Sequence, residues 1–368
     1  MKRYRFLISG GGTGGHIYPA LAIADELRRR LPEAKFLFVG AKDRMEMEKV
    51  PQAGYEIRGL WISGIDRRFS WKNLLFPLKV LSSLLKANRI IREFKPHLVI
   101  GTGGFASGPT LAVAAKRGIP TVLQEQNSFG GITNKLLAGK ADKIFVAYEG
   151  MERFFPEKSL KLTGNPVREF LVQALPEKKL GLANFNLNPE QPVLLVLGGS
   201  LGARRINELI GQKSRFIQDL GFQLIWQCGA AYYHQYQFLE SERVRVRPFI
   251  SDMASAYAAA DLIISRAGAG AVSELSIVGK PVIFIPSPNV AEDHQTKNAR
   301  AMSEIGAALL IAERDLDTQF DSVLSELVSN PQLFKSLGER LRSEAKPYAT
   351  QQIVDEIEQI IKKQDAAE

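Results

Sequence analysis

The sequence predicts an α/β protein of two domains, each built around a parallel β-sheet that helices cover on both faces. Three observations lead to this fold class. The chain has 368 residues, which is long for a single hydrophobic core. Short apolar runs alternate with segments of helix length, as expected for parallel strands. The alternation pauses in a polar stretch between Gly164 and Pro192 and then starts again.

Composition narrows the class of protein. With 45% hydrophobic and 24% charged residues, the chain has the balance of a soluble globular protein rather than a disordered one. The single cysteine, Cys228, excludes an internal disulfide and fits a reducing compartment. The apolar run Phe6–Ile8 is too short for a signal peptide, and we expect no transmembrane helix. The net charge of +9 favours acidic partners such as phosphates, nucleic acid or anionic lipid.

The first half opens with a strand over Arg5–Gly10, followed by apolar residues at helical spacing over Ile17–Leu31. Further strands are expected at Lys35–Val39, Leu98–Gly101, Thr121–Glu125 and Ile144–Ala147. In the second half they are expected at Val193–Leu197, Gln223–Trp226, Val244–Val246, Leu262–Ser265 and Val282–Ile285. We expect domains over 1–166 and 167–347, and a C-terminal helix over 348–368 that packs back on the first domain.

Three glycine-rich turns lie between an expected strand and an expected helix. They are Gly10–His16, Gly198–Arg204 and Arg266–Glu274. Free backbone N–H groups at a helix start favour anions, so a phosphate group is the first hypothesis for each turn. In an open α/β sheet such turns gather at the carboxyl ends of the strands, where ligands bind. The alternative for each is a purely structural turn.

The first turn also matches the spacing of a dinucleotide fingerprint, with glycines at positions 10, 12 and 15. The acid that should bind the ribose is not well placed, because Asp43 comes several residues after the second strand. A nucleotide-triphosphate loop of the Walker type is excluded, since no Gly-Lys-Ser/Thr follows. An NAD-dependent oxidoreductase therefore stays open as an alternative.

A set of motifs in chain order resembles the MurG-type transferases of peptidoglycan synthesis. The motifs are Gly11–Ala20, Gly103–Pro109, Glu125–Asn127, Gly164–Arg168, Gly198–Ser200 and Ser265–Ala269. Gln124, Leu201 and Gly270–Ala271 depart from residues that are common in the family. The resemblance covers most of the chain, and the motifs are specific as a set.

This resemblance implies a GT-B fold, in which two Rossmann-like domains with parallel sheets face each other across a cleft. It implies inverting transfer of N-acetylglucosamine from UDP-N-acetylglucosamine to lipid I, which is undecaprenyl-pyrophosphoryl-N-acetylmuramoyl-pentapeptide, to form lipid II. The first domain would bind the acceptor and face the membrane, and the second would bind the UDP-sugar. No cofactor or metal would be required. The expected location is peripheral, on the cytoplasmic face of the bacterial cell membrane.

The resemblance also implies residue roles. His16 is the candidate general base, because histidine titrates near neutral pH, and the alternative is a histidine that caps the loop. Glu274 would bind ribose hydroxyls, Arg168 and Ser200 would lie near the pyrophosphate, and Gln295 and Asn298 would read the sugar. The remaining donor contacts would be Thr13, Gly14, Gly15, Asn127, Ile250, Ala269, Gly270, Ala271, Val272 and Ser273. The acceptor side would include Gly103, Gly104, Phe105 and Ser107.

No metal site is indicated, because the four histidines are scattered and none has ligand spacing. Asp315–Asp317 matches the Asp-x-Asp of metal-dependent transferases, but we interpret it as a loop and helix cap.

The stretch Arg67–Lys95 carries eight Lys or Arg residues and one acid, Glu93, among leucines and aromatics. It fits an amphipathic element that contacts an anionic membrane surface. The alternative is an ordinary helix whose Leu74, Leu78, Leu81, Leu85 and Ile91 face the core.

Two further alternatives remain at this point. The chain could be a GT-B transferase with another lipid or small-molecule acceptor, which an acceptor-dependence assay would separate. It could also be a nucleic-acid binder, given a pI near 9.5, but no nucleic-acid motif is visible and we expect no such partner.

Overall fold

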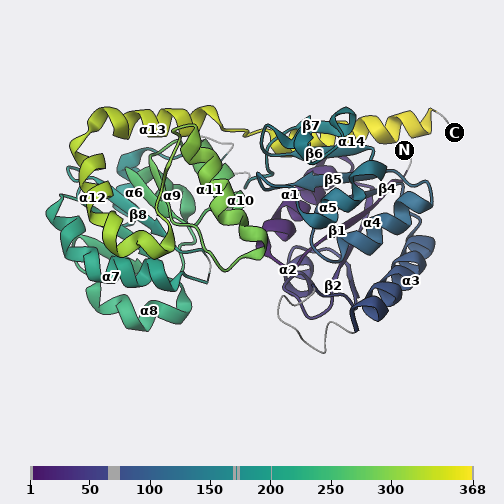
Figure 1. Cartoon of the computed structure of the whole chain (residues 1–368), viewed down its shortest axis with the longest axis horizontal. Coiled ribbons are helices and arrows are strands. Elements are labelled where there is room, and N and C mark those ends of the chain that lie inside the picture. The colour runs from purple at the N-terminus through teal and green to yellow at the C-terminus, as the bar shows by residue number, and fades with distance from the viewer. Residues whose placement is uncertain (1–2, 65–74, 169–170, 172–174, 200, 367–368) are drawn as a thin grey trace. The chain divides into compact units, whose positions relative to one another are not determined.

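The computed structural model describes residues 3–64, 75–168, 171, 175–199 and 201–366. Internal contacts divide the chain into two compact units, Met1–Val167 with Tyr348–Glu368, and Arg168–Pro347. Each unit is a parallel β-sheet between helices (Figure 1). This arrangement confirms the predicted α/β class.

The first sheet has the strand order β3-β2-β1-β4-β5-β6-β7, with every neighbouring pair parallel. Its strands are β1 (Arg5–Gly10), β2 (Lys35–Ala41), β3 (Ile57–Leu60), β4 (Leu98–Gly103), β5 (Thr121–Glu125), β6 (Lys143–Val146) and β7 (Leu160–Leu162). Its helices are α1 (Gly14–Arg30), α2 (Glu46–Gln52), α3 (Phe76–Phe94), α4 (Ser107–Lys116), α5 (Ile132–Leu137) and α14 (Ala349–Asp365).

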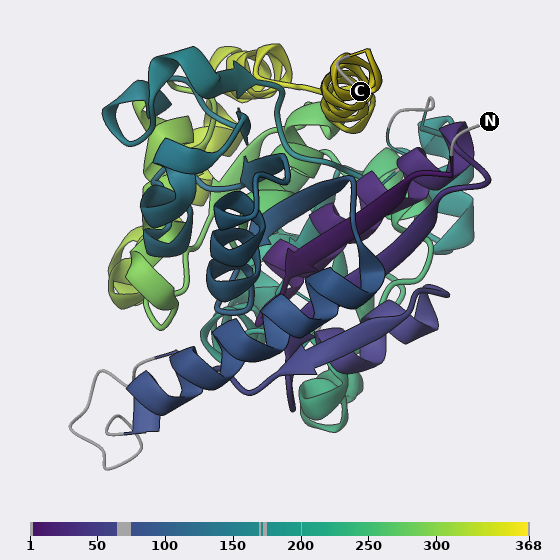
Figure 2. The ribbon, with the colours of Figure 1, turned by 90° about the vertical axis from the view of Figure 1, so that its right-hand side faces the viewer.

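This unit has two cores, because successive side chains of a strand point to opposite faces of the sheet. In β1, Leu7 points into a core shared with α3, α4 and α5, whereas Phe6 and Ile8 point into a core shared with α1 and α14. All three side chains are fully buried. Figure 2 shows α3 and α4 over one face of this sheet. The strands read as continuous apolar runs because both faces are covered.

The second sheet has the order β10-β9-β8-β11-β12-β13, again with parallel neighbours. Its strands are β8 (Val193–Leu197), β9 (Gln223–Gln227), β10 (Val244–Arg247), β11 (Leu262–Ser265), β12 (Val282–Phe284) and β13 (Leu309–Leu310). Its helices are α6 (Lys178–Asn184), α7 (Arg204–Asp219), α8 (Ala230–Tyr236), α9 (Met253–Ala259), α10 (Ala269–Val278), α11 (His294–Glu304), α12 (Leu316–Ser329) and α13 (Pro331–Ser343). A core around the buried Trp226 joins one face of this sheet to α7, α8, α12 and α13.

Three edge or near-edge strands escaped the sequence prediction. They are β3, β7 and β13, which have four, three and two residues. Runs this short carry too few apolar positions to show a period. The expected strands of both halves are present, with ends shifted by one or two residues.

In each sheet there is one point at which the order of strand addition reverses. In the first unit the chain moves from β1 to β2 and β3 on one side, then returns to β4 on the other side of β1. In the second unit β8 and β11 form the equivalent pair. Such a switch point separates the loops that follow its two strands and leaves room for a ligand. The glycine-rich loops of both units follow these four strands.

A buried carboxylate fixes the first glycine loop. Glu46, at the start of α2, is fully buried and accepts hydrogen bonds from the N–H groups of Gly12 and Ala41, both at 2.9 Å. A side chain at Gly11 would overlap this carboxylate, so glycine is required there. Glu46 therefore joins the loop after β1 to the end of β2.

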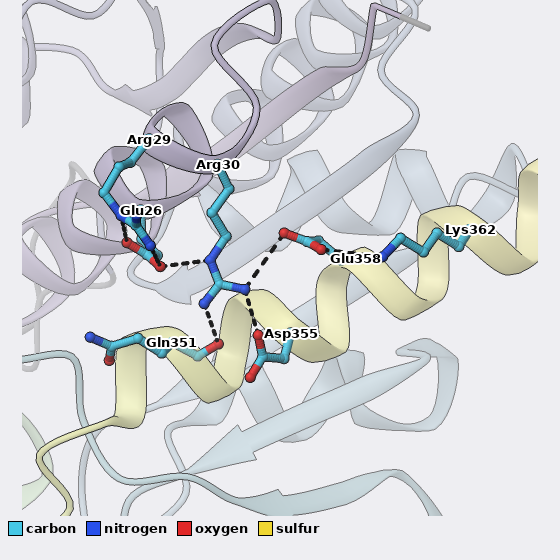
Figure 3. A network of polar contacts seen from close by, with 7 residues as sticks. All are labelled: Glu26, Arg29, Arg30, Gln351, Asp355, Glu358 and Lys362. Carbon is cyan, nitrogen blue, oxygen red and sulfur yellow. Dashed lines mark hydrogen bonds and ion pairs between the residues drawn. The ribbon is translucent and has the colours of Figure 1, made fainter. Parts of the chain in front are cut away.

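The C-terminal helix α14 is held on α1 by an apolar contact and a charged network. Ile353, Ile357 and Ile361 lie in the core with α1. Arg30 reaches from α1 to Asp355 and Glu358, and donates to the carbonyl oxygen of Gln351 (Figure 3). It also pairs with Glu26, whose pKa is lowered by the hydrogen bond from Arg29 and then by that from Arg30, despite burial.

We expect Glu46→Gln to lower the free energy of unfolding by about 1–3 kcal/mol, because one carboxylate acceptor becomes an NH₂ group facing backbone donors. Glu48→Gln on the same helix is the matched control, since Glu48 is 67% exposed, and its change should stay within about 0.5 kcal/mol. Calorimetric unfolding measures both. Equal effects of the two substitutions would contradict the role given to Glu46.

We expect Arg30→Met to lower the unfolding free energy of the first unit by about 1–3 kcal/mol, because it removes the cation that joins the carboxylates of α1 and α14 and its bond to the carbonyl oxygen of Gln351. Arg29→Met is the control, because Arg29 is 67% exposed and exposed ion pairs contribute at most about 1 kcal/mol. Denaturant titration compares the two. If Arg29→Met costs as much as Arg30→Met, the network of Figure 3 does not hold α14.

Candidate functional site

Two glycine-rich loops touch at the switch point of the first unit. The N–H of Gly11 donates to the carbonyl oxygen of Gly103 at 3.3 Å. Gly104 has a φ of 87°, and a side chain there would overlap the carbonyl of Gly11. Glycine at Gly104 is therefore needed for both backbone conformation and close approach. The loops after β1 and β4 form one surface.

His16 lies on this surface, in the first turn of α1. Its Nδ1 is 2.8 Å from Oε1 of Gln126, and its carbonyl oxygen accepts a hydrogen bond from Oγ1 of Thr102 at 2.8 Å. The imidazole packs over Gly103, where a Cβ would come within 2.8 Å of Nδ1 and Cε1. His16 is half-buried. Among the described residues, its Nε2 has no hydrogen-bond partner, so this atom is available to a substrate.

Three buried amides extend behind His16. Nε2 of Gln126 donates to the carbonyl oxygens of Thr102 and Gln124, at 2.8 and 3.0 Å. Nε2 of Gln124 donates to Oδ1 of Asn165 at 2.8 Å, and Nδ2 of Asn165 donates to the carbonyl oxygen of Gln126 at 2.9 Å. All three amides are at most 2% exposed. The network joins the end of β5 to β4 and to the segment after β7.

The other expected contacts of the first unit differ in accessibility. Thr13 and Gly15 are exposed and Gly14 is partly exposed, and the first N–H groups of α1 have no partner within the helix. Asn127 is partly buried and donates to Glu125, a buried carboxylate that also accepts from Gly131 and Asn134. Glu125 thus shapes the loop that carries Asn127.

On the acceptor side, Phe105 is 46% exposed and its ring packs against Gly64. Ser107 is different, because its side chain is fully buried and its hydroxyl donates to the carbonyl oxygens of Ser9 and Gly103. Ser107 therefore supports the loop from beneath rather than presenting its hydroxyl to solvent.

The second unit contains a pocket of about 330 Å³ at its switch point. It is lined by Gly198, Gly202, Ala203, Arg204, Arg205, Arg266, Ser287, Asn289, Val290, Gln295 and Glu313. The loop after β8, the loop after β11 and the start of α11 therefore meet there. Oε1 of Gln295 accepts a hydrogen bond from the N–H of Ser287 at 2.9 Å. The NH₂ group of Gln295 takes no part in this bond.

Arginines give this pocket a positive wall. Arg266 is 15% exposed, pairs with Glu313 at 2.6 Å and donates to the carbonyl oxygen of Ile285. Arg205 pairs with Glu208 and Asp317, whereas Arg204 is 72% exposed and makes only a 3.7 Å contact with Glu208. Together with the N-terminus of α7, these groups suit a phosphate-bearing ligand.

A second polar group lies at the start of α10. Arg168 donates through Nε and Nη2 to the two oxygens of Glu274, at 2.7 and 2.5 Å, and the hydroxyl of Tyr257 lies 3.4 Å from Glu274. Burial lowers the pKa of Arg168, but the hydrogen bond to Glu274, the charge of Glu274 and the contact with Tyr257 together outweigh it and raise that pKa. Burial, and then the charge of Glu274, raises the pKa of Tyr257. Two residues expected to bind different parts of the donor are therefore paired with each other.

The remaining expected donor contacts of the second unit fall into two groups. Gly270 is exposed, and Ala271 and Ser273 are partly exposed in the first turns of α10, but Ala269 and Val272 are buried. Ile250 is buried, and its N–H donates to Oε1 of Gln227 at 2.9 Å. Asn298 is fully buried and donates to the carbonyl oxygen of Ala267. Ser200 lies outside the described residues.

The Asp-x-Asp segment does not gather metal ligands. Asp315 precedes α12 without capping it through its side chain, which differs from the expected cap, and Asp317 pairs with Arg205. Within the described ranges, no group of three or more His, Cys, Asp or Glu side chains could hold a metal ion.

Helix α3 presents leucines to solvent. Leu75, Leu78, Leu81 and Leu85, hereafter the leucine face, are 43–64% exposed. The buried positions of α3 are Ser83, Ala87, Ile90 and Ile91. The core-facing alternative is therefore wrong for Leu78, Leu81 and Leu85 and correct for Ile91, while Arg67–Leu74 lies outside the described residues. No helix in the described part of the chain is both long and apolar enough to cross a membrane.

Several residues of these sites were missed by the sequence analysis. Glu46 has no local signal, because its partner Gly12 is 34 residues away in the chain. Gln126 lies in the Glu125–Asn127 motif, but its contact with His16 spans 110 residues and gives no sign in the sequence. Arg204 belongs to the predicted turn Gly198–Arg204, and Arg205 could have been found with it, since it follows directly at the helix start.

Comparison with known proteins gives the family. Residues 6–146 match the glycosyltransferase family 28 N-terminal domain, and residues 193–363 match the C-terminal domain of that family. A UDP-N-acetylglucosamine–N-acetylmuramyl-(pentapeptide) pyrophosphoryl-undecaprenol N-acetylglucosamine transferase from Christiangramia forsetii is 55% identical over 97% of this chain and 98% of its own length. The protein of that name from Flavobacterium psychrophilum is 53% identical, over 99% of this chain and 100% of its own length.

Solved structures agree with the sequence relatives. The crystal structure of Acinetobacter baumannii MurG has a TM-score of 0.78 and 28% identity, over 97% of this chain and 100% of its own. A calicheamicin glycosyltransferase with 17% identity and a TM-score of 0.74, over 99% of each chain, shares the fold. These comparisons confirm the GT-B class and decide against the dinucleotide oxidoreductase. The chain belongs to the MurG family, the UDP-N-acetylglucosamine–N-acetylmuramyl-(pentapeptide) pyrophosphoryl-undecaprenol N-acetylglucosamine transferases.

Proposed function

We propose that this chain transfers N-acetylglucosamine from UDP-N-acetylglucosamine to lipid I and so forms lipid II in peptidoglycan synthesis. The observation that carries the proposal is 55% identity, over nearly the whole chain, to a relative named for this transfer. The physical features agree, because both units place glycine-rich helix starts at a switch point. The reaction inverts the anomeric carbon.

In this proposal the second unit binds the donor. The N-terminus of α7 and the exposed Arg204 neutralise the pyrophosphate, and Gln295 contacts the sugar in the same pocket. Glu274 accepts from the ribose hydroxyls, for which it must exchange at least one of its bonds to Arg168. The released guanidinium then becomes available to the diphosphate. Asn298 and Ile250 support these contacts through the backbone bonds that they already make.

The first unit supplies the base and the acceptor surface. Nε2 of His16 takes the proton of the acceptor hydroxyl while the hydroxyl oxygen attacks the anomeric carbon of the donor sugar. The bond from this carbon to UDP breaks on the side opposite the attack. The proton is later released to solvent, and the leaving diphosphate is stabilised by helix N-termini and arginines without a metal. Gly103 lies against His16, and with Gly104 and the exposed Phe105 that follow it offers a small, partly apolar surface to the acceptor.

The leucine face of α3 anchors this unit to an anionic membrane surface, on the cytoplasmic side. Three exposed leucines lie on α3 and Leu75 directly precedes it, and the helix carries Lys79, Lys86, Arg89 and Arg92 against a single acid, Glu93. Apolar side chains can enter the lipid boundary while neighbouring cations stay at the headgroups. Such an anchor brings the enzyme to an acceptor that is itself a lipid.

We expect purified protein to release UDP from UDP-N-acetylglucosamine only when a lipid I analogue is present. His16→Ala should lower kcat by about 100-fold or more with little change in the KM for the donor, because it removes the base and no donor contact. His234→Ala, on α8, is the control. UDP release with unrelated acceptors contradicts the proposed acceptor, and near-normal kcat in His16→Ala removes His16 from the chemistry.

We expect a triple Leu78, Leu81 and Leu85→Ser variant to bind anionic phospholipid vesicles about tenfold or more weakly, because three exposed apolar side chains are lost. Vesicle co-sedimentation measures binding, and turnover with a water-soluble acceptor should stay near wild type. Leu180→Ser, which changes a 59% exposed leucine on α6, is the comparison. Unchanged vesicle binding of the triple variant refutes the anchor.

A further inference from the structure

We infer that Gln126 is a positioning residue that fixes the tautomer of His16, with the proton on Nδ1 and an unprotonated Nε2. The inference deepens the proposed function, since it rests on His16 acting as the base. It concerns a residue that touches neither the reacting atoms nor the donor, and acts only through the imidazole.

The first step is the orientation of the Gln126 amide. One end of this amide faces the carbonyl oxygens of Thr102 and Gln124, at 2.8 and 3.0 Å. Backbone carbonyl oxygens can only accept, so the NH₂ group must lie at this end. A flipped amide would place three oxygens against one another in a buried site. The orientation therefore follows from the partners of the amide and not from its atom labels.

The neighbouring amides fix the same orientation independently. Nδ2 of Asn165 faces the carbonyl oxygen of Gln126, so Oδ1 of Asn165 faces Gln124. Gln124 must then donate to Asn165 through Nε2 and turn its own Oε1 toward the NH₂ group of Gln126, which it contacts. Backbone carbonyl oxygens set the amides of Gln126 and Asn165, and Asn165 in turn sets that of Gln124. Only one arrangement pairs every donor with an acceptor.

The orientation of Gln126 determines which nitrogen of the His16 imidazole carries the proton. With its NH₂ group engaged, Gln126 presents only the oxygen Oε1 to Nδ1 of His16, at 2.8 Å. Oε1 cannot donate, so the proton of this hydrogen bond must come from Nδ1. A neutral imidazole carries one proton, which leaves a lone pair on Nε2. Because Gln126 is 1% exposed, no solvent replaces the bond if the other tautomer forms.

The surrounding backbone holds the imidazole ring next to Gln126. The backbone of His16 is tied to Thr102, whose own carbonyl oxygen accepts from Gln126. Gly103, with a φ of 97°, leaves the space that the ring occupies. The imidazole, the strand end that supports it and the amide that orients it therefore share one frame. Nε2 is left as the ring atom that can accept a proton from the acceptor hydroxyl.

The test compares Gln126→Met, which keeps the length of the side chain but can neither accept nor donate, with Gln126→Glu, which keeps an acceptor for Nδ1. Gln223→Met is the matched control. Gln223 is also a buried glutamine, 1% exposed, and it bonds only to the backbone of Asn188 and Gln191 in the other unit. The full chain is labelled with ¹⁵N-histidine, and His16→Ala identifies the signals of His16.

We expect His16 of the unsubstituted protein to carry its proton on Nδ1, and Gln126→Met to shift it toward the Nε2–H form. Gln126→Met should lower kcat by about tenfold or more with a donor KM within about twofold, because general base catalysis needs the free Nε2. Gln126→Glu should keep the Nδ1–H form and part of kcat, but lower the free energy of unfolding, because its second oxygen would face the carbonyl oxygens of Thr102 and Gln124. Gln223→Met should leave the tautomer and kcat unchanged.

A double-mutant cycle separates positioning from general support of the loop. In the His16→Ala background, Gln126→Met should lower kcat by no more than about twofold, since the residue that it orients is gone. An equal loss in both backgrounds, or a proton on Nε2 of His16 in the unsubstituted protein, overturns the inference. If His16→Ala keeps its turnover, the proposed base fails instead, and the tautomer measurement still decides the inference, also where Gln126→Met does not fold.

Discussion

The parallel pairing of β1 with β4 is the constraint on which the first unit's site depends. Ile8 pairs with Ile100 and Ser9 with Gly101, and the register then shifts so that Gly10 pairs with Gly103. This places the loops after β1 and β4 in contact, with no room for side chains at Gly10 or Gly104. The glycines are thus a consequence of two strand ends meeting at a switch point, and His16 takes its place from the same pairing.

Internal carboxylates hold the positively charged or donor groups of both units. Glu46 accepts from Gly12, Glu313 pairs with Arg266, and Glu274 pairs with Arg168. The first two pairs are largely buried, and breaking them would leave an unpaired buried group. The third differs in its cation, because Arg168 is 47% exposed although Glu274 is 15% exposed. The third pair can therefore exchange its bonds with solvent while the other two keep the loops in shape.

A structural feature can be predicted from the sequence when the residues that determine it lie close together in the chain. The strands β1, β4, β8 and β11 were predicted because their apolar runs end in glycine-rich turns. The position of His16 at a helix start followed from the same pattern. Glu46 and the role of Gln126 could not be predicted, because a buried carboxylate and a buried amide look like surface residues until their distant partners are known. The pairing of Arg168 with Glu274 was missed for the same reason.

Helix α3 shows why periodicity alone does not decide which face of a helix is buried. Its leucines recur at three- and four-residue spacing, which is typical of a core-facing stripe. The structure instead buries Ser83 and Ala87, whose small side chains let α3 lie close to its neighbours, and the hydroxyl of Ser83 donates to the carbonyl oxygen of Trp61. A stripe of leucines left exposed beside lysines and arginines carries a hydration cost in water that lipid would remove. The packing of this unit therefore does not explain why the leucine face is apolar, whereas contact with lipid would.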